Sequence, residues 1–334
     1  LFYQAGSTFT VTDGIELNGQ SGNTRIQLRS TTEDSAYYWD IDGATQAVSY
    51  VDAKDCDASS GDTVDADDGT NRDSGNNVNW DFVSSGDRYW VASSAGNWND
   101  GNNWSESSGG SGGASIPYYE NKVIFDGAGL GNCTINDSVV ECAGILVYST
   151  YTATINASSA TIVCKGNFEM YGGTFTPVSS TLIIDATNGD RNFIGNGQTF
   201  NTVVFKSTEN AARVVTLGSG SMTFNSDFRV EAVGSGNVTI DASVNNPSLT
   251  INGCLDYSGT GSGTESISMG NGTWTCNKVN LSGGSITAGG STLVLNTNGG
   301  GIAGGGQTLN NLTITGTRVG ISGNTTVNGT LTVG

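Results

Sequence analysis

The stretch "GNGQTFNTVVF" covers residues 195–205, and the stretch "GGGQTLNNLTI" covers residues 304–314. The two align residue for residue, so that Gln198 matches Gln307. The first opens with Gly-Asn-Gly and the second with three Gly residues, which are typical of a turn, and each ends in a short run rich in β-branched and apolar residues, which is typical of a strand. A turn-and-strand unit that recurs after about 110 residues predicts a repeat protein built from β-strands.

The cysteines indicate a shorter period inside the long one. Cys142 and Cys164 are separated by about 22 residues, and the same spacing separates Cys254 from Cys276. Short runs that alternate apolar and other side chains recur along most of the chain, for example "TLII" at 181–184 and "TLVL" at 292–295. No long stretch carries the apolar stripe of a helix. We therefore predict an all-β fold, a parallel β-helix or β-solenoid with about 22 residues per coil.

In such a fold the paired cysteines become vertical neighbours, because successive coils stack about 4.8 Å apart. We expect disulfide bonds Cys142–Cys164 and Cys254–Cys276 on this ground. The alternative is that the four are inward-facing thiols that act as small apolar side chains. Cys56 and Cys133 receive no partner from the spacing. Six cysteines in this arrangement favour an oxidising compartment over the cytosol.

Charge and composition limit the partners and the chemistry. The 334 residues include 31 Asp and Glu against 13 Lys and Arg, which gives a net charge of −18, and no His. Such a surface repels phosphates, so neither nucleic acid nor an anionic membrane is expected to bind, and no apolar run is long enough to span a bilayer. Without His, and without a nucleophile or zinc motif, we assign no catalytic residue and expect a protein that is not an enzyme.

Residues 87–126 interrupt the repeating pattern. The segment carries Trp90, Trp98 and Trp104, followed by a run of Gly and Ser. We interpret the tryptophans as a hydrophobic cap over the end of a solenoid, because burial of such large rings is strongly favourable. The alternatives are an exposed platform for sugar rings and an interface with another subunit. The predicted domains are a β-helical module at 1–86, the Trp-rich capping segment at 87–126, and a second β-helical module at 127–334 with the internal repeat.

The stretch "DTVDADDGTNRDSGNN" at 62–77 is the densest acidic part of the chain. Its carboxylates are hard oxygen ligands of the kind that Ca²⁺ prefers, although the spacing departs from that of an EF-hand. A solvated acidic turn is the alternative, and no other cofactor is expected. The candidate calcium ligands are Asp65, Asp67, Asp68 and Asp73.

Asn-x-Ser/Thr sequences occur several times in a chain rich in all three residues. The four candidate glycosylation sites are Asn156, Asn237, Asn271 and Asn324.

The pattern Gly96-Asn97-Trp98 through Asn103-Trp104, followed by "NKVIFD" at 121–126, resembles the segment that opens β-helical modules in large bacterial surface proteins. Autotransporter-like adhesins with parallel β-helix repeats are among them. The resemblance implies a right-handed parallel β-helix on an exported adhesin or structural protein. Its motifs specify architecture more than activity.

The expected function is that of an extracellular or cell-surface structural protein, in which a β-helical rod serves as a filament subunit or as the stalk of an adhesin. Head-to-tail stacking of copies, or continuation in a longer tandem protein, would cover the open ends of the solenoid. The alternative is a carbohydrate-binding or carbohydrate-active β-helix, with Trp274 or the aromatic run at 37–39 on a groove that contacts surface glycans. An ice-binding solenoid is a more distant alternative.

Overall fold

The computed structural model describes residues 1–20, 24–43, 45–67, 70–82, 86–296, 300–303 and 305–334. The described residues are almost entirely strands and turns, and their one short helix is the 3₁₀ turn η1 at Gly101–Asn103. Stacked parallel strands form a β-solenoid of about 14 turns with about 23 residues between successive turns. The predicted fold class and coil length are confirmed.

The chain divides into two compact units, Leu1–Ala143 and Gly144–Gly334. This division differs from the three predicted segments. The strands of residues 2–82 nevertheless pair only among themselves in the described structure, so the hydrogen-bonded sheets do change at the predicted boundary near residue 86.

In the first part of unit 1, parallel strands form short stacked sheets. The first of these sheets runs in the order β1 (Phe2–Tyr3), β4 (Ile26–Ser30), β7 (Val51–Ala53), β10 (Arg72–Asp73). The other sheets are β2 (Thr8–Val11), β5 (Tyr37–Ile41), β8 (Cys56–Asp57); β3 (Gly14–Asn18), β6 (Thr45–Ser49); and β11 (Trp80–Phe82), β9 (Val64–Ala66). Their inward side chains, including Tyr37, Trp39 and Val51, form one apolar core.

The second part of unit 1 begins with an antiparallel strand pair, in contrast to the parallel pairs of the first part. Strand β14 (Trp104–Ser105) pairs antiparallel with β12 (Arg88–Trp90), which pairs parallel with β15 (Lys122–Phe125). Strand β13 (Gly96–Asn97) pairs with β16 (Cys133–Thr134), and β17 (Val139–Cys142) is the last strand of the unit. Because β14 lies at the edge of its sheet with reversed direction, it ends the parallel ladder there.

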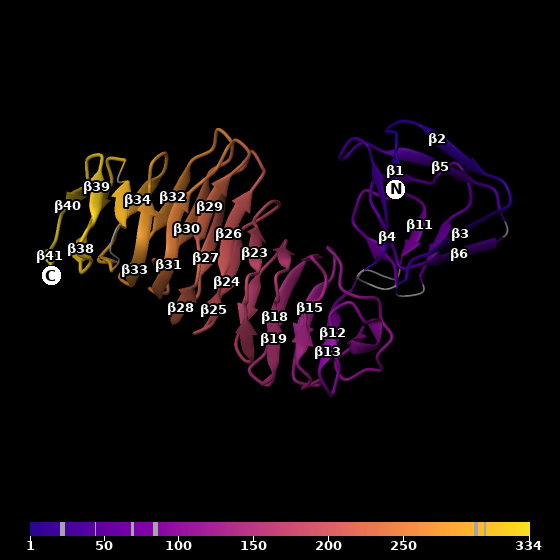
Figure 1. Ribbon diagram of the computed structural model, residues 1–334, viewed down its shortest axis with the longest axis horizontal. Helices are drawn as coiled ribbons and strands as arrows, with labels where there is room; N and C mark the ends of the chain where they lie inside the picture. The colour runs from indigo at the N-terminus through magenta and orange to yellow at the C-terminus, as the bar shows by residue number, and fades with distance from the viewer. Residues whose placement is uncertain (21–23, 44, 68–69, 83–85, 297–299, 304) are drawn as a thin grey trace. The chain divides into compact units, whose positions relative to one another are not determined.

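Unit 2 stacks its strands in three ladders, and Figure 1 shows them side by side along the unit. The first ladder contains β18 (Gly144–Val147), β21 (Phe168–Met170), β24 (Arg191–Ile194), β27 (Arg213–Leu217), β30 (Val238–Asp241), β32 (Glu265–Ser268) and β34 (Ser285–Thr287). The second begins with β19 (Thr154–Asn156) and β22 (Thr174–Thr176), is interrupted between β22 and its neighbour β25, and continues with β25 (Thr199–Phe200), β28 (Ser221–Phe224), β35 (Thr292–Leu295), β38 (Asn311–Ile314) and β41 (Leu331–Val333).

The third ladder contains β20 (Thr161–Cys164), β23 (Thr181–Asp185), β26 (Thr202–Ser207), β29 (Phe228–Ala232), β36 (Gly301–Ala303) and β39 (Gly320–Ser322). Two long strands, β31 (Ser248–Tyr257) and β33 (Thr273–Asn280), bend so that each contributes to the second and the third ladder. The remaining pair is β37 (Thr308–Leu309) with β40 (Thr326–Val327).

The core of unit 2 is a set of vertical columns of apolar side chains. In the third ladder, every member of one column below the last coil is at most 2% exposed: Ile162, Leu182, Val203, Phe228, Leu255, Val279 and Ile302. Phenylalanines fill much of the space between the ladders, and Phe168 stacks on Phe193 with ring centroids 5.5 Å apart. Continuous columns explain why inward positions need only be apolar while their identities vary.

The predicted disulfide bonds are not present. All six cysteines are thiols. The register explains the error for the second pair: Cys276 lies opposite Ile251, and Cys254 lies opposite Lys278, because the register shifts between residues 251 and 254. The two cysteines therefore occupy different positions in the coil. Cys142 and Cys164 are both buried, and burial also raises the pKa of Cys276 above its ordinary value. Cys142, Cys164 and Cys276 therefore match the alternative prediction of buried thiols that act as small apolar residues, whereas Cys254 is only half-buried.

The internal repeat is confirmed at the level of hydrogen bonds. Gln198 donates from Nε2 to the carbonyl of Gly173 and accepts from the N–H of Phe175, at 3.0 and 2.8 Å. Gln307 does the same with Gly284 and Ile286, at 2.7 and 2.8 Å. Each glutamine amide thus takes the place of a strand's own backbone and joins its coil to the preceding one.

An asparagine three residues later completes this corner. Asn201 donates to the carbonyl of Ser180, and Asn310 donates to the carbonyl of Ser291. The G-x-G-Q-T-x-N stretch is therefore a corner motif in which two amide side chains bind the previous coil at the point where the ladders are interrupted. We call Gln198 and Gln307 the corner glutamines.

We expect Gln198→Ala to lower the free energy of unfolding by about 1–3 kcal/mol, because a partly buried N–H and a partly buried carbonyl of the preceding coil lose their partner. Gln307→Ala should have an effect of similar size, since its bonds are equivalent. Denaturant unfolding followed by circular dichroism measures both. The exposed strand residue Gln27 supplies a matched control as Gln27→Ala, and equal effects of all three substitutions would contradict the assigned role.

Candidate functional site

The outer face of the β4, β7 and β10 sheet carries a grid of polar side chains. Gln27, Asp52 and Arg72 lie opposite one another on the three strands. Two residues further along, Arg29 of β4 points to the same face as these, because side chains alternate along a strand. This arrangement follows from parallel pairing in register, which places chemically unrelated positions of the sequence about 4.8 Å apart.

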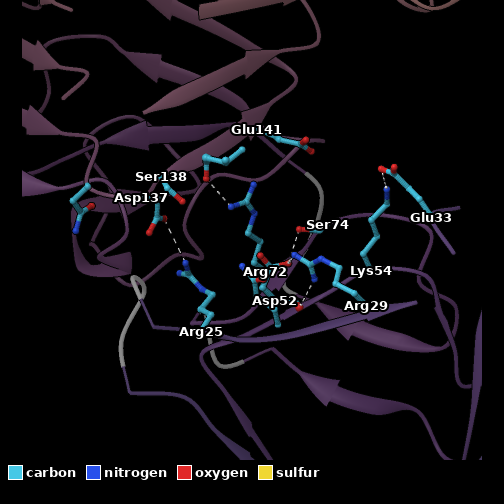
Figure 2. Close-up of a pocket in the computed structure, with 13 residues that line it drawn as sticks. Arg25, Arg29, Glu33, Asp52, Lys54, Arg72, Ser74, Asp137, Ser138 and Glu141 are labelled. Carbon is cyan, nitrogen blue, oxygen red and sulfur yellow. Dashed lines mark hydrogen bonds and ion pairs between the residues drawn. The ribbon is translucent and has the colours of Figure 1, made fainter. Parts of the chain in front are cut away.

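A cavity of about 510 Å³ lies over this face. Figure 2 shows side chains from the sheet and from the segment 136–141 pointing into it. Four of the chain's 13 Lys and Arg residues line the cavity together with four carboxylates. The lining residues are Arg25, Gln27, Arg29, Glu33, Asp52, Lys54, Arg72, Ser74, Asn136, Asp137, Ser138, Val139 and Glu141.

Asp52 is the centre of the bonding on the sheet side. Its carboxylate accepts from Arg29 at 2.8 Å and from the Ser74 hydroxyl at 2.5 Å, and Arg29 also donates to the Asp52 carbonyl at 2.7 Å. The Asp52 side chain is only 8% exposed. Charge-assisted bonds of this kind are stronger than neutral ones, so they fix the Arg29 guanidinium against the sheet.

Lys54 lies at the rim of the cavity. Its ammonium group is 3.1 Å from the carboxylates of both Glu33 and Asp34, which are largely exposed. Exposed ion pairs contribute little stability. Water or another anion can therefore readily replace the Glu33 or Asp34 carboxylate beside the Lys54 ammonium group.

On the opposite side, Arg25 and Asp137 form an ion pair at 3.5 Å with both side chains more than 90% buried. Asn99 also donates to the Asp137 carboxylate at 3.1 Å, and Arg72 donates to the carbonyl of Val139 at 2.9 Å. Burial raises the pKa of Asp137 above its ordinary value although Arg25 acts in the other direction, and burial lowers the pKa of Arg25 although Asp137 raises it. These bonds join the β4–β10 sheet to the segment 136–141.

The arrangement suits two tasks. It holds two segments of unit 1 together through charges removed from water, and it offers a small hydrophilic cavity whose opposite charges nearly balance. A polar or charged small molecule fits such a lining better than an apolar one, since ionised groups keep their favourable contacts only with polar partners.

The predicted calcium ligands are not brought together as a set in the described part of the chain. Asp65 lies in β9, and Asp73 lies in β10, where its carboxylate accepts from the Gly75 N–H and from Asn77 at 2.8 and 2.6 Å. Asp68 lies outside the described residues. Among the described residues, no three Cys, Asp or Glu side chains form a group that could hold a metal ion. Calcium binding stays a prediction.

The three tryptophans of the predicted cap are fully buried. The ring centroids of Trp90 and Trp98 each lie 5.0 Å from that of Trp104 in edge-to-face contact, and Trp104 also contacts Phe125. Trp104 donates its N–H to the carbonyl of Trp98, and Trp90 donates to the carbonyl of Gly131. No ring face is left for a sugar, so the structure does not provide the alternative platform at these residues.

The Gly/Ser run that follows the tryptophans is folded against them. Gly113 donates to the carbonyl of Gly101, and Ala114 donates to that of Trp104. A Cβ atom at Gly112 would lie 1.9 Å from the carbonyl oxygen of Asn102, so only glycine fits there. The run is therefore a packed surface loop rather than a linker.

The aromatic residues predicted for a sugar-binding groove are also in the core. Trp274, Tyr37 and Trp39 are at most 3% exposed, and Tyr38 is half-buried. Of the candidate glycosylation sites, Asn237, Asn271 and Asn324 are exposed and Asn156 is half-buried. The amide oxygens of Asn156, Asn237 and Asn271 accept backbone N–H bonds, so these side chains also shape turns.

Sequence reasoning missed the charged cavity. The available signal was the recurrence of cations at the outward positions of adjacent coils, in Arg29, Lys54 and Arg72. This signal could not be recognised from the sequence, because the coil lengths in unit 1 vary and the pairing register of the strands was therefore unknown.

Comparison of the chain with models of protein families, with curated proteins and with solved structures found no match. The described helical structure includes nothing long and apolar enough to cross a membrane. The resemblance to adhesin modules therefore remains an expectation from the sequence.

We expect Arg25→Met to lower the free energy of unfolding of unit 1 by about 3 kcal/mol, since it leaves the buried Asp137 carboxylate without its cation. The double variant Arg25→Met/Asp137→Leu should recover most of the loss, because it removes both buried charges. Denaturant unfolding of Arg25→Met, Asp137→Leu and the double variant measures the coupling energy between the two residues. If the effects of the two single substitutions simply added in the double variant, a direct interaction between Arg25 and Asp137 would be contradicted.

Burial raises the pKa of Asp73, although the Gly75 N–H and the Asn77 amide act in the other direction. A folded-state pKa above the unfolded value contributes stability at low pH, below about 4, that is lost as the pH rises through the folded-state pKa. We expect Asp73→Asn to be more stable than the native chain at pH 7, and the difference to vanish by about pH 3.

Thermal unfolding across this pH range measures the effect of Asp73→Asn. Asp81→Asn, at an exposed carboxyl of β11, is the control and should change little. If Asp73→Asn were equally destabilising at both ends of the range, the carboxylate itself would be required by the fold.

Proposed function

We propose that this protein is a non-enzymatic structural protein in which the β-solenoid serves as a rod, either as a subunit of a filament or as the stalk of an adhesin outside the cell. The single observation that carries the proposal is the stacking of parallel strands into hydrogen-bonded ladders along unit 2. The extracellular location is supported by the resemblance to bacterial surface proteins and by the acidic, hydrated surface.

The columns of unit 2 that end in Leu331 and Ile321 are covered at every coil except the last one described. In the second ladder, Leu293 and Leu312 are each 1% exposed, whereas Leu331, which lies opposite Leu312, is 55% exposed. In the third ladder, Ile302 is 2% exposed and its partner Ile321 is 51% exposed. Val333 beside them is 69% exposed.

Strands β39, β40 and β41 each pair on one side only in the described structure, and Figure 1 shows them at the yellow end of the unit. Their outer edges present backbone N–H and carbonyl groups in the geometry of a parallel ladder. An unpaired edge with uncovered apolar side chains is a template for a further strand. A further coil, from a second copy or from a longer tandem chain, would bury these side chains and continue the ladder.

The hydrogen bonds between successive coils also suit a rod. Bonds between coils run along the axis in three ladders, and the corner glutamines and asparagines add bonds where the ladders are interrupted. Pulling along the axis therefore loads many bonds at once, which supports a mechanical function.

Electron microscopy and light scattering over a range of protein concentrations test the proposal. We expect end-to-end assemblies of the native chain, and their loss in Leu331→Lys/Val333→Lys, because two charges on the end coil oppose the addition of another coil. Val244→Lys changes an equally exposed apolar residue in a turn away from this coil and should assemble normally.

Monomers of the native chain at every concentration would contradict stacking between copies. Equal assembly by the double-lysine variant would contradict the assigned surface. If the protein is instead a stalk within a longer chain, adding a further coil to the sequence after residue 334 should stabilise the end coil.

A further inference from the structure

Two tyrosines on the outside of unit 2 lie one directly above the other. Tyr148 follows β18, and Tyr171 follows β21, the next strand of the same ladder. Val147 pairs with Met170, and the Tyr171 N–H donates to the Val147 carbonyl at 2.8 Å, so the register continues to the two tyrosines. Val147 and Met170 point inward and are fully buried, whereas both tyrosines point outward and are 46% exposed.

The turn after the second tyrosine fits closely onto the first coil. A Cβ atom at Gly172 would lie 2.4 Å from the carbonyl oxygen of Tyr148, so only glycine allows this approach. Tyr148 also accepts a turn bond through its carbonyl from the Tyr151 N–H. The backbones that carry the two tyrosines are therefore fixed at the spacing of adjacent coils, about 4.8 Å.

A carboxylate lies beside the rings on the same outer face. Glu169 precedes Tyr171 by two residues, which places both side chains outward. Its Oε1 accepts from the amides of Asn167 and Asn192, each at 3.3 Å, and the Asn192 N–H donates to the Asn167 amide oxygen at 2.9 Å. Two coils thus contribute side chains that orient one carboxylate through its Oε1 atom.

The chemistry of this face identifies the class of ligand. Exposed tyrosine rings present an apolar face with negative charge density, which matches the apolar C–H face of a sugar ring. The Glu169 carboxylate and the two asparagine amides offer acceptors and donors for hydroxyl groups beside it. The chain's net charge of −18, with Glu169 at the centre of the site, opposes acidic sugars.

We propose that Tyr148, Tyr171, Glu169, Asn167 and Asn192 form a binding site for a neutral hexopyranose polysaccharide. Successive sugar rings lie along the solenoid axis over the two tyrosines, and Glu169 accepts hydrogen bonds from their hydroxyl groups. The site uses rigid strands and few mobile groups, so little conformational entropy is lost on binding. It is independent of the rod function proposed above, because it lies on a lateral face and needs no end-to-end contact.

The experiment measures binding by affinity electrophoresis in gels that contain soluble neutral polysaccharides, namely a β-1,3-glucan, a β-1,4-glucan, an α-1,4-glucan and a mannan, with polygalacturonate as the acidic contrast. Calorimetry with the hexasaccharide of any polymer that retards the protein then gives the affinity. We expect at least one neutral polymer, and not polygalacturonate, to bind the native chain.

Tyr148→Ala and Tyr171→Ala should each weaken binding by about tenfold, because each removes one stacked ring. Tyr171→Phe keeps the ring and should bind nearly normally, whereas Glu169→Gln should weaken binding because the amide is a poorer acceptor. Val178→Ala, at another exposed apolar residue of the same unit, is the matched control. Unchanged melting temperatures confirm that the variants fold.

Failure of every neutral polymer to bind the native chain would overturn the proposal, as would equal binding by the native chain and a Tyr148→Ala/Tyr171→Ala variant. Binding of polygalacturonate alone would also overturn it, since the site would then recognise negative charge. None of these outcomes bears on assembly through the end coil.

Discussion

The hydrogen bonds between the backbones of successive coils are the interaction on which the rest of the structure depends. They fix the register, and the register decides which side chains lie above one another. Apolar residues stack into columns such as the one from Ile162 to Ile302, and polar residues stack into outer rows. Side chains support this ladder where it is interrupted, as the corner glutamines do when they imitate the backbone of a neighbouring strand.

The same constraint accounts for the surfaces with proposed roles. The charged cavity exists because parallel pairing places Gln27, Asp52 and Arg72 in one row. The tyrosine site exists because Val147 and Met170 are paired, which brings the two residues after them onto one outer face. The uncovered side chains of Ile321 in β39 and Leu331 in β41 are the ends of columns that are buried in the preceding coils. Each surface is a consequence of stacking rather than of a local motif.

Much of the fold could be predicted from the sequence, because short alternating runs, turn residues and a period near 23 residues leave few architectures. Equivalence of Gln198 and Gln307 was visible in the sequence, and their bonds bear it out. The predicted Cys254–Cys276 bond was wrong because equal spacing does not imply equal register when coil lengths vary: Val238 lies opposite Glu265, but Thr292 lies opposite Asn311. For the same reason the cavity and the tyrosine site could not be located, since both depend on which outward residues face one another. Burial of Trp90, Trp98 and Trp104 followed from their size alone.

Native-state hydrogen exchange, read along the chain by mass spectrometry, tests the central claim most directly. The account predicts slow exchange for the backbone amides of the stacked strands from β20 to β38, because each is bonded to a neighbouring coil, and fast exchange in β39, β40 and β41, whose outer side is uncovered. If the amides of the interior strands exchanged as fast as those of the turns between them, the stacked ladder and the roles derived from it would be contradicted.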